Sequence, residues 1–309
     1  MGTQASSTSH KEFIALMATT MSLMALSIDA MLPALNAIGS SLQVTDPNDN
    51  QLVISSMFLG MSVGLMLYGP IADSFGRKKA IYLGVGIFLI GDLISLFAQD
   101  FSSMIVGRLL QGFGAAACRV VSITMIRDKF SGKEMARIMS LIMMIFIMVP
   151  ALAPALGQFI LLFSSWRTIF VVLLLFAVGA LLWLHLRQEE TLAPEHRKSF
   201  SFPHIKSAIV ETLKHPISLP YTVAAGIMFG SFVGYLSSSQ QIIQLQYQTG
   251  ELFALYFGIL ALAVGISSFI NSKLVMKYPL EKLCQLALSG MSLLSIVFFI
   301  YAQAHEGQP

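Results

Sequence analysis

Residues 69–79 read Gly69-Pro70-Ile71-Ala72-Asp73-Ser74-Phe75-Gly76-Arg77-Lys78-Lys79, and they separate two long apolar stretches, residues 52–68 and 80–98. A polar segment this short predicts a loop that turns the chain straight back into a bilayer. Gly69 and Gly76 permit tight backbone geometry because they carry no Cβ atom. The cationic run at the end of the segment predicts a cytoplasmic loop. Asp73 precedes Arg77 by four residues, close enough to pair with it or to face the end of a neighbouring helix.

Composition places the whole chain in a membrane. Hydrophobic residues make up 55% and charged residues 11% of the sequence, whereas soluble domains carry about 25% charged residues. The two cysteines, Cys118 and Cys284, lie far apart in apolar stretches, which favours small buried hydrophobes over a disulfide or a metal site. The sequence has no phosphate-binding G-x-x-x-x-G-K-[ST], no G-x-S-x-G and no metal-ligand cluster. It therefore predicts no enzyme, no cofactor and no metal.

Nine apolar segments approach the length of about 20 residues that spans a bilayer. The predicted fold class is an all-α membrane protein with about nine transmembrane helices. The expected spans are residues 14–36, 52–68, 80–98, 104–126, 138–159, 166–186, 219–238, 252–271 and 283–302.

Basic residues alternate between the loops and predict the orientation. The loops that would be cytoplasmic hold Arg77, Lys78, Lys79, Arg127, Lys129, Lys133, Arg137, Arg187, Arg197, Lys198, Lys206, Lys214, Lys273, Lys277 and Lys282. The opposite loops contain a single basic residue, Arg167. This asymmetry predicts a cytoplasmic amino terminus. It also explains the net charge of +3 without an anionic partner, so no nucleic acid is expected.

The longest loop divides the chain into three parts. Residues 1–187 are expected to form a six-helix bundle, residues 188–218 a cytoplasmic linker with a surface helix near 205–214, and residues 219–309 a partial second bundle of three helices. Nine spans place the tail, residues 304–309, outside.

Asp29 is the first candidate for chemistry because it lies within the first apolar segment. A carboxylate inside a membrane is costly unless it is paired, solvated or protonated. Two interpretations stay open: an acid at a helix end near the outer interface, or a protonatable group facing a central aqueous cavity.

Arg108 and Arg119 lie in the fourth span, eleven residues apart. Eleven residues are close to three helical turns, so both arginines share one face. Gly107, Gly112 and Gly114 would let a neighbouring helix approach closely. For Arg119, bonding to backbone carbonyls and a substrate or gating role are equally open.

Asp92 is a second carboxylate within an apolar segment. Counting from the ends of each span places Asp29, Asp92 and Arg108 in the outer half of the membrane, with depths within about 5 Å of each other. A pair or triad is possible, and either acid can pair with Arg108.

The fifth span contains Pro150, Pro154 and Gly157. Two prolines remove helical hydrogen bonds and permit a bend. Ordinary membrane prolines and glycines are the alternative interpretation.

These motifs together resemble the major facilitator superfamily of secondary transporters. The loop G-x-x-x-D-x-x-G-R-K-K at 69–79 resembles the loop between its second and third helices, although Ser74 stands where a basic residue is usual. R-x-x-Q-G-x-G from Arg108 resembles the fourth-helix motif of the drug:H+ antiporter branch. Residues 149–158 resemble the antiporter motif G-P-x-x-G-G, with Ala153 and Gln158 in place of its glycines. With L-P-A-L at 32–35, Arg127-Asp128 and Trp166-Arg167, the chain resembles the Bcr/CflA group of bacterial multidrug efflux transporters.

The resemblance implies an inner-membrane protein that exchanges protons for small hydrophobic compounds by rocking of two bundles about a midplane site. In that cycle Asp29 carries the proton, Arg108 senses its charge, and residues 154–157 let the fifth helix bend. Gly69, Asp73, Gly76, Arg77 and Lys78 belong to the gating loop. No oligomer is implied. The alternatives are a metabolite permease of the same fold and a truncated, non-transporting fragment, because a member of this family should carry three more helices.

Overall fold

The computed structural model describes residues 9–274 and 277–304, and every regular element within them is a helix. The amino terminus expected in the cytoplasm and most of the tail expected outside, residues 1–8 and 305–309, lie outside the described residues. The α-helices are α1 (His10–Asp29), α2 (Leu35–Ser41), α3 (Leu52–Phe75), α4 (Arg77–Leu96), α5 (Phe101–Lys129), α6 (Gly132–Phe163), α7 (Arg167–Arg187), α8 (Phe202–Lys214), α9 (Ser218–Gln240), α10 (Phe253–Leu274) and α11 (Leu280–Ala304). Short helices are η1 (Leu32–Ala34), η2 (Pro47–Gln51), η3 (Pro194–His196), the π-helix η4 (Gln241–Gln246) and η5 (Gly250–Leu252).

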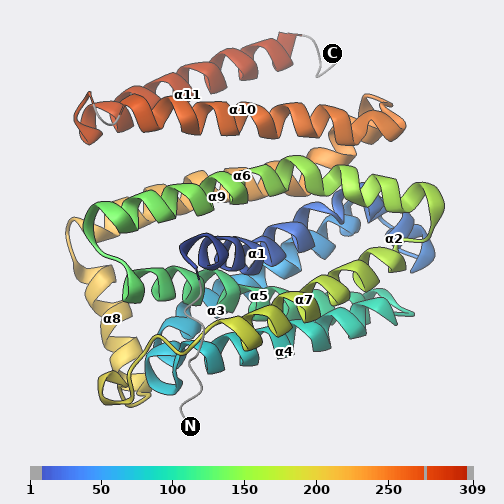
Figure 1. Cartoon of the computed structure of the whole chain (residues 1–309). Coiled ribbons are helices and arrows are strands. Elements are labelled where there is room, and N and C mark those ends of the chain that lie inside the picture. Colours follow the sequence, from blue (N-terminus) through green and yellow to red (C-terminus); the bar gives the residue numbers. More distant parts are fainter. Residues whose placement is uncertain (1–8, 275–276, 305–309) are drawn as a thin grey trace.

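The long helices run roughly parallel, as spans of one membrane would (Figure 1). Within the described residues, 7 helical segments are long and apolar enough to cross a bilayer. The fifth and eighth expected spans fall on α6 and α10, where the apolar helical stretches Met148–Phe163 and Phe253–Ser267 are shorter. The prediction of an all-helical membrane protein is therefore confirmed.

The first expected span is broken. α1 ends at Asp29, and the chain continues through the 3-10 turn η1 into α2. Pro33 lies in this turn, and proline has no N–H to continue the helical ladder. Residues 14–36 were predicted to form one span, so the break directly after Asp29 was not predicted from the sequence.

The expected loop at residues 69–79 is much shorter than predicted. α3 continues to Phe75 and α4 begins at Arg77, so Gly69 lies inside a helix. A Cβ atom at Gly69 would meet no other atom within 4 Å, and the tight turn predicted there is wrong. The polar residues Asp73 and Ser74 continue α3 and do not end it. The reversal falls on Gly76, whose φ of 100° is a conformation that glycine adopts readily.

We call the end of the bundle that carries Arg77, Lys78, Lys79, Arg127 and Lys129 the basic end. α8 lies there, across the direction of the long helices (Figure 1). It confirms a helix near residues 205–214 and begins three residues earlier than expected. At the other end, Asp100 caps α5 by accepting hydrogen bonds from Ser103 N and Oγ at 2.8 and 2.7 Å, which lower the pKa of its carboxyl.

The core lies where α5 packs between α3 and α4. A Cβ atom on Gly112 would collide with the Met57 carbonyl of α3, and one on Gly114 would collide with the Gly84 carbonyl of α4. The close approach predicted for the glycines of the fourth span is therefore confirmed. Because backbones touch here, α5 is held by van der Waals contact along its length.

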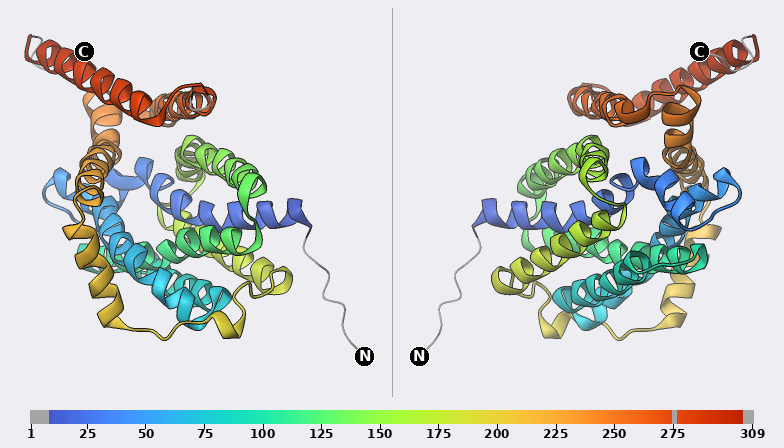
Figure 2. Two further views of the ribbon diagram at one scale, coloured as in Figure 1. Left: turned by 90° about the vertical axis from the view of Figure 1, so that its left-hand side faces the viewer. Right: turned by 90° about the vertical axis from the view of Figure 1, so that its right-hand side faces the viewer.

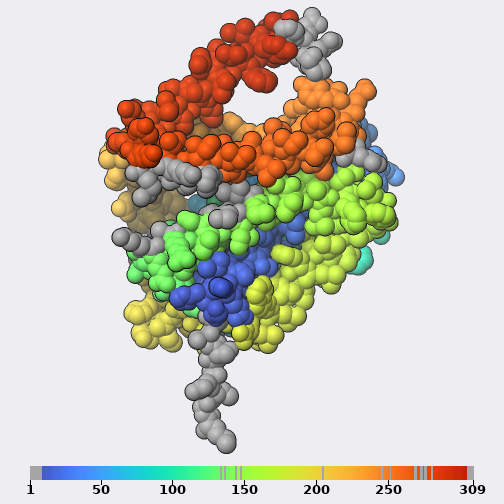
Figure 3. All heavy atoms as spheres, turned by 45° about the horizontal axis from the view of Figure 1, so that its top comes forward, coloured from blue at the N-terminus to red at the C-terminus, as the bar shows by residue number. Residues whose placement is uncertain are grey.

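The second part of the chain, α9 to α11, meets the first six long helices chiefly through α6 and α10. α9 is buried only near its end, at Leu236, Ser237, Ser239 and Gln240. In α11, Leu283 is half-buried, while the other side chains whose exposure is described are exposed. Figure 2 shows α10 and α11 beside the first bundle, and Figure 3 shows α11 projecting from the surface.

Candidate functional site

Arg108 lies at the centre of the first bundle and is fully buried. Its guanidinium donates three hydrogen bonds: Nε to the Val53 carbonyl at 3.0 Å, Nη1 to Gln111 Oε1 at 2.8 Å and Nη2 to the Ser27 carbonyl at 3.0 Å. The planar guanidinium suits three fixed acceptors. Arg108 therefore joins α5 to α1 and α3.

The bond to Ser27 closes the end of α1. The N–H of Met31, which would reach the Ser27 carbonyl in a continuing helix, bonds the Ile28 carbonyl at 3.3 Å instead. The helix break thus frees the Ser27 carbonyl, and Arg108 takes it. A cation at a helix C-terminus is also favoured by the helix dipole. Arg108 consequently caps α1 two residues before Asp29.

Asp92 reaches Arg108 through Gln111. Gln111 Nε2 donates to Asp92 Oδ1 at 2.6 Å, while Gln111 Oε1 accepts from Arg108. Asp92 is fully buried, and its other oxygen, Oδ2, has no hydrogen-bond partner among the described residues. Of the two acids weighed from the sequence, Asp92 is the one linked to Arg108, and the link is Gln111, which the sequence named only as part of the fourth-span motif.

Asp29 is 4% exposed and has no recorded hydrogen bond or ion pair within the described part of the chain. It lies at the last residue of α1, where the helix breaks. Tyr235 of α9 lies within electrostatic reach of its carboxylate. Asp29 therefore faces the side of the first bundle on which the second part packs.

A cavity of about 350 Å³ lies on this side, between α6, α9 and α10. Tyr235 and Phe257 stack across it with ring centroids 6.1 Å apart and an interplanar angle of 8°. None of the described residues that line it is charged; they are Phe146, Pro150, Phe232, Tyr235, Leu236, Phe257, Leu260, Ala261 and Val264. Its chemistry suits an apolar or aromatic ligand.

Arg119 lies beside the same cavity. Its guanidinium carbon is 5.8 Å from the centroid of the Phe146 ring, within cation–π range. The sequence left open a bond to backbone carbonyls or a substrate or gating role for Arg119. The contact found is with Phe146, a ring that lines the cavity. Arg108 and Arg119 thus serve different neighbours, one inside the first bundle and one at its edge.

α6 carries the prolines expected to bend the fifth span. Pro150 and Pro154 both lie inside this helix, which is continuous from Gly132 to Phe163. A Cβ atom on Gly157 would collide with the Ala30 carbonyl and approach Pro33. Gly157 therefore lets α6 touch the break that follows Asp29, a contact that the sequence did not predict.

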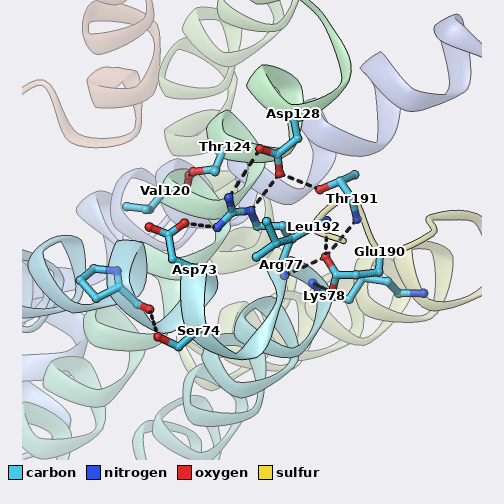
Figure 4. Close-up of polar contacts among 11 residues, drawn as sticks. Asp73, Ser74, Arg77, Lys78, Val120, Thr124, Asp128, Glu190, Thr191 and Leu192 are labelled. Atoms are coloured by element: carbon cyan, nitrogen blue, oxygen red, sulfur yellow. Dashed lines mark hydrogen bonds and ion pairs between the residues drawn. The ribbon is translucent and has the colours of Figure 1, made fainter. Parts of the chain in front are cut away.

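The basic end holds a charge cluster around Arg77 (Figure 4). Arg77 Nη1 donates to Asp73 Oδ1, and Arg77 Nε donates to Asp128 Oδ2 at 2.9 Å. Arg77 is 5% exposed, so these charge-assisted bonds are partly shielded from water. The predicted pairing of Asp73 with Arg77 is confirmed, and Asp128 is a second partner. Lys78 points elsewhere, and its Nζ donates to the His185 carbonyl at 3.2 Å.

At the end opposite the basic end, amide side chains join the two parts of the chain. Gln241, the first residue of η4, accepts from Gln51 Nε2 at 2.5 Å and donates to Asn48 Oδ1 at 2.9 Å. These bonds cross 190 and 193 positions of sequence. Together with the burial of α9 near the same end, they show that the two parts touch there.

A family model described as Major Facilitator Superfamily matches residues 12–307. The chain belongs to the major facilitator superfamily. Proteins of this superfamily are transporters, need no cofactor and are not enzymes, as the sequence predicted.

Two bacterial relatives are about a third identical to this major facilitator protein over the residues that align. It is 32% identical over 248 residues to an uncharacterized MFS-type transporter, YdgK, of Bacillus subtilis (strain 168), covering 79% of this chain and 61% of YdgK. It is 30% identical over 268 residues to a bicyclomycin resistance protein homolog of Haemophilus influenzae, covering 85% of this chain and 66% of that protein. The chain thus spans about two thirds or less of the length of these relatives.

A third relative, the multidrug resistance protein MdtL of Escherichia coli, is 25% identical over 246 residues, which cover 79% of this chain and 61% of MdtL. Among solved structures, a D-xylose-proton symporter matches 96% of this chain and 77% of its own, with a TM-score of 0.67 and 16% identity. The human organic anion transporter MFSD10 matches 83% and 71%, with a TM-score of 0.60 and 15% identity. These structures establish the major facilitator fold.

Proposed function

We propose that this chain is part of a proton-coupled exporter of hydrophobic, drug-like compounds, of the Bcr/CflA type. The observation that carries the proposal is the aromatic cavity between α6, α9 and α10, with Asp29 on the same side of the first bundle and without a hydrogen bond or ion pair to any described residue. A transporter of this kind needs a binding surface for apolar molecules and a titratable group beside it. Here both lie where the two parts of the chain meet.

The cavity favours an apolar substrate over a polar metabolite. Its volume of about 350 Å³ lies within the range of about 300–1,000 Å³ typical of small-molecule sites. A sugar-like solute needs several convergent polar groups, whereas Tyr235 is the one polar side chain among the described residues of the lining. Stacked aromatic rings bind flat apolar molecules through their faces and do not require matching polar contacts.

Asp29 is the group that binds and releases the coupling proton. A buried carboxylate in a membrane is functional by default because it costs free energy to keep there. Asp92 is less suited to direct exchange with the cavity because it is fully buried and linked to Gln111.

Arg108 transmits the change at Asp29. It caps α1 through the Ser27 carbonyl, so a movement of the end of α1 on protonation of Asp29 acts on this bond. Arg108 also holds the Val53 carbonyl of α3. The change would therefore reach α3, which ends at the charge cluster around Arg77.

The basic end faces the cytoplasm in this proposal, following the excess of Lys and Arg. The hydrogen bonds of Gln241 to Gln51 and Asn48 then join the two parts of the chain at the outer end. Rocking of the two parts would break these bonds and close the basic end over the Arg77 cluster. The location is the cytoplasmic membrane of a bacterium, in line with the bacterial relatives.

The names of two relatives support export of drugs. One is a bicyclomycin resistance protein homolog and another a multidrug resistance protein. Because the chain spans 61–66% of these relatives, a piece that binds substrate but does not transport it is the second candidate.

Everted membrane vesicles from bacteria that lack their own drug pumps test the proposal. Ethidium is added to energised vesicles that contain the chain, and proton release from the lumen is followed with a pH-sensitive dye. Ethidium-dependent proton efflux supports the proposal, and Asp29→Asn should abolish it while Asp100→Asn, outside the spans, should not. Ethidium binding without proton efflux would favour the second candidate.

A further inference from the structure

The residues that follow α7, from Gln188 on, contact the first bundle. Glu190, Thr191 and Leu192 lie beside the start of α4 (Figure 4), and the Lys198 N–H further along donates to the Asp73 carbonyl at the end of α3. Gln188 is 1% exposed and Leu192 is 9% exposed. We call residues 188–198 the strap.

Glu190 is the centre of the strap. Its Oε1 accepts hydrogen bonds from the backbone N–H groups of Arg77, Thr191 and Leu192 at 2.9, 3.0 and 3.1 Å, and its Oε2 accepts from Lys78 N at 3.1 Å. Arg77 and Lys78 are the first two residues of α4, where N–H groups have no helical partner. A carboxylate is favoured there by the helix dipole as well. Glu190 therefore caps α4 from 112 positions away.

The strap also binds the two acids that hold Arg77. Thr191 Oγ1 donates to Asp128 Oδ2 at 2.9 Å, the oxygen that also accepts from Arg77 Nε. Lys198 N donates to the Asp73 carbonyl at 3.0 Å. The backbone N–H of Arg77 and both of its acidic partners, Asp73 and Asp128, thus form hydrogen bonds with the strap.

Gly76 makes room for this arrangement. A Cβ atom at that position would lie 2.6 Å from Glu190 Oε2. The absent side chain therefore lets the Glu190 carboxylate lie directly over the turn.

We propose that Glu190 is a positioning residue that fastens the strap to the first bundle and holds Arg77 between Asp73 and Asp128. The strap then moves with the first bundle, and the movable linker starts after Lys198 rather than at residue 188. Movement of the second part would pull on the Arg77 cluster through this attachment. Only this last consequence rests on the proposed transport function; the attachment does not.

Hydrogen exchange of the purified chain in lipid nanodiscs tests the attachment directly. In the wild type, the amides of residues 76–78 and 190–192 should exchange slowly and those of residues 199–201 fast. Glu190→Ala should speed exchange about tenfold in both slow segments because a charged acceptor is lost. Glu190→Gln should give a smaller change, since an amide offers one acceptor oxygen in place of two.

Glu189→Gln is the matched control, because Glu189 is adjacent and exposed, and it should exchange as the wild type does. Exchange in α5 reports whether each variant is folded. If Glu190→Gln and Glu190→Ala both leave residues 76–78 as protected as in the wild type, the strap is not fastened by Glu190 and the proposal is wrong.

Ethidium transport in vesicles tests the positioning role separately. Glu190→Ala should lower the maximal rate severalfold with KM unchanged, because the residue is far from the cavity, and Glu190→Gln should restore part of the rate. Faster exchange with a wild-type rate would reduce Glu190 to a helix cap and overturn its positioning role. If the wild type itself does not transport ethidium, the proposed function fails, and hydrogen exchange still decides the attachment.

Discussion

Gln111 lies between Asp92 and Arg108 and bonds both, at 2.6 Å to the carboxylate and 2.8 Å to the guanidinium. The amide is oriented by this requirement, because its oxygen must face the cation and its nitrogen the acid. The acid and the base are therefore coupled through a neutral side chain. A change of charge at Asp92 would act on Arg108 through the orientation of this amide.

Gln111→Leu should destabilise the protein. It leaves Asp92 without its hydrogen bond and Arg108 with a free donor in the core, at a cost of about 1–3 kcal/mol. Thermal unfolding in detergent should show a lower Tm. Gln158→Leu is the control because the buried Oε1 of Gln158 has no partner among the described residues, and it should be neutral. Equal Tm values for wild type and Gln111→Leu would contradict the network.

Gly76→Ala should impair the basic end, whereas Gly69→Ala should not. Alanine at residue 76 meets both a positive φ and the Glu190 carboxylate, while residue 69 lies in a helix with open space around it. A residue held at positive φ costs about 1–3 kcal/mol. The measurement is the Tm of both variants; a larger loss for Gly69→Ala would contradict the structure of the turn.

Tyr235→Ala should weaken binding of a flat aromatic probe. It removes one of the two stacked rings of the cavity, and we expect the Kd for ethidium to rise about tenfold. Fluorescence titration of the purified chain measures this. Phe298→Ala, on the exposed face of α11, is the control, and an equal effect of the two substitutions would show that ethidium does not bind in the cavity.

The sequence predicted what hydrophobic length and charge determine. The nine apolar segments and the asymmetry of Lys and Arg can be read from composition along the chain. Helices were found for all nine apolar segments. The pairing of Asp73 with Arg77 follows from four-residue spacing, which brings the two side chains together across the junction of α3 and α4.

Contacts between distant residues could not be predicted in the same way. Gln111 is an ordinary polar residue in its helix until Asp92 and Arg108 are placed around it. Glu190 lies in a charged stretch, where a solvated side chain is the usual outcome, and only the fold brings it to α4. The break after Asp29 frees the Ser27 carbonyl, and the bond that Arg108 makes to it joins two helices, which the sequence of one span does not show.

Proton release on substrate binding tests the central claim, that Asp29 couples protons to an apolar substrate. Ethidium is added to purified, weakly buffered protein across a pH series, and the released protons are measured for wild type, Asp29→Asn and Asp100→Asn. We predict that wild type and Asp100→Asn release protons over the same pH range, while Asp29→Asn binds ethidium and releases none. Release from Asp29→Asn equal to that from the wild type would contradict the account and transfer the coupling role to another group, with Asp92 the next to test.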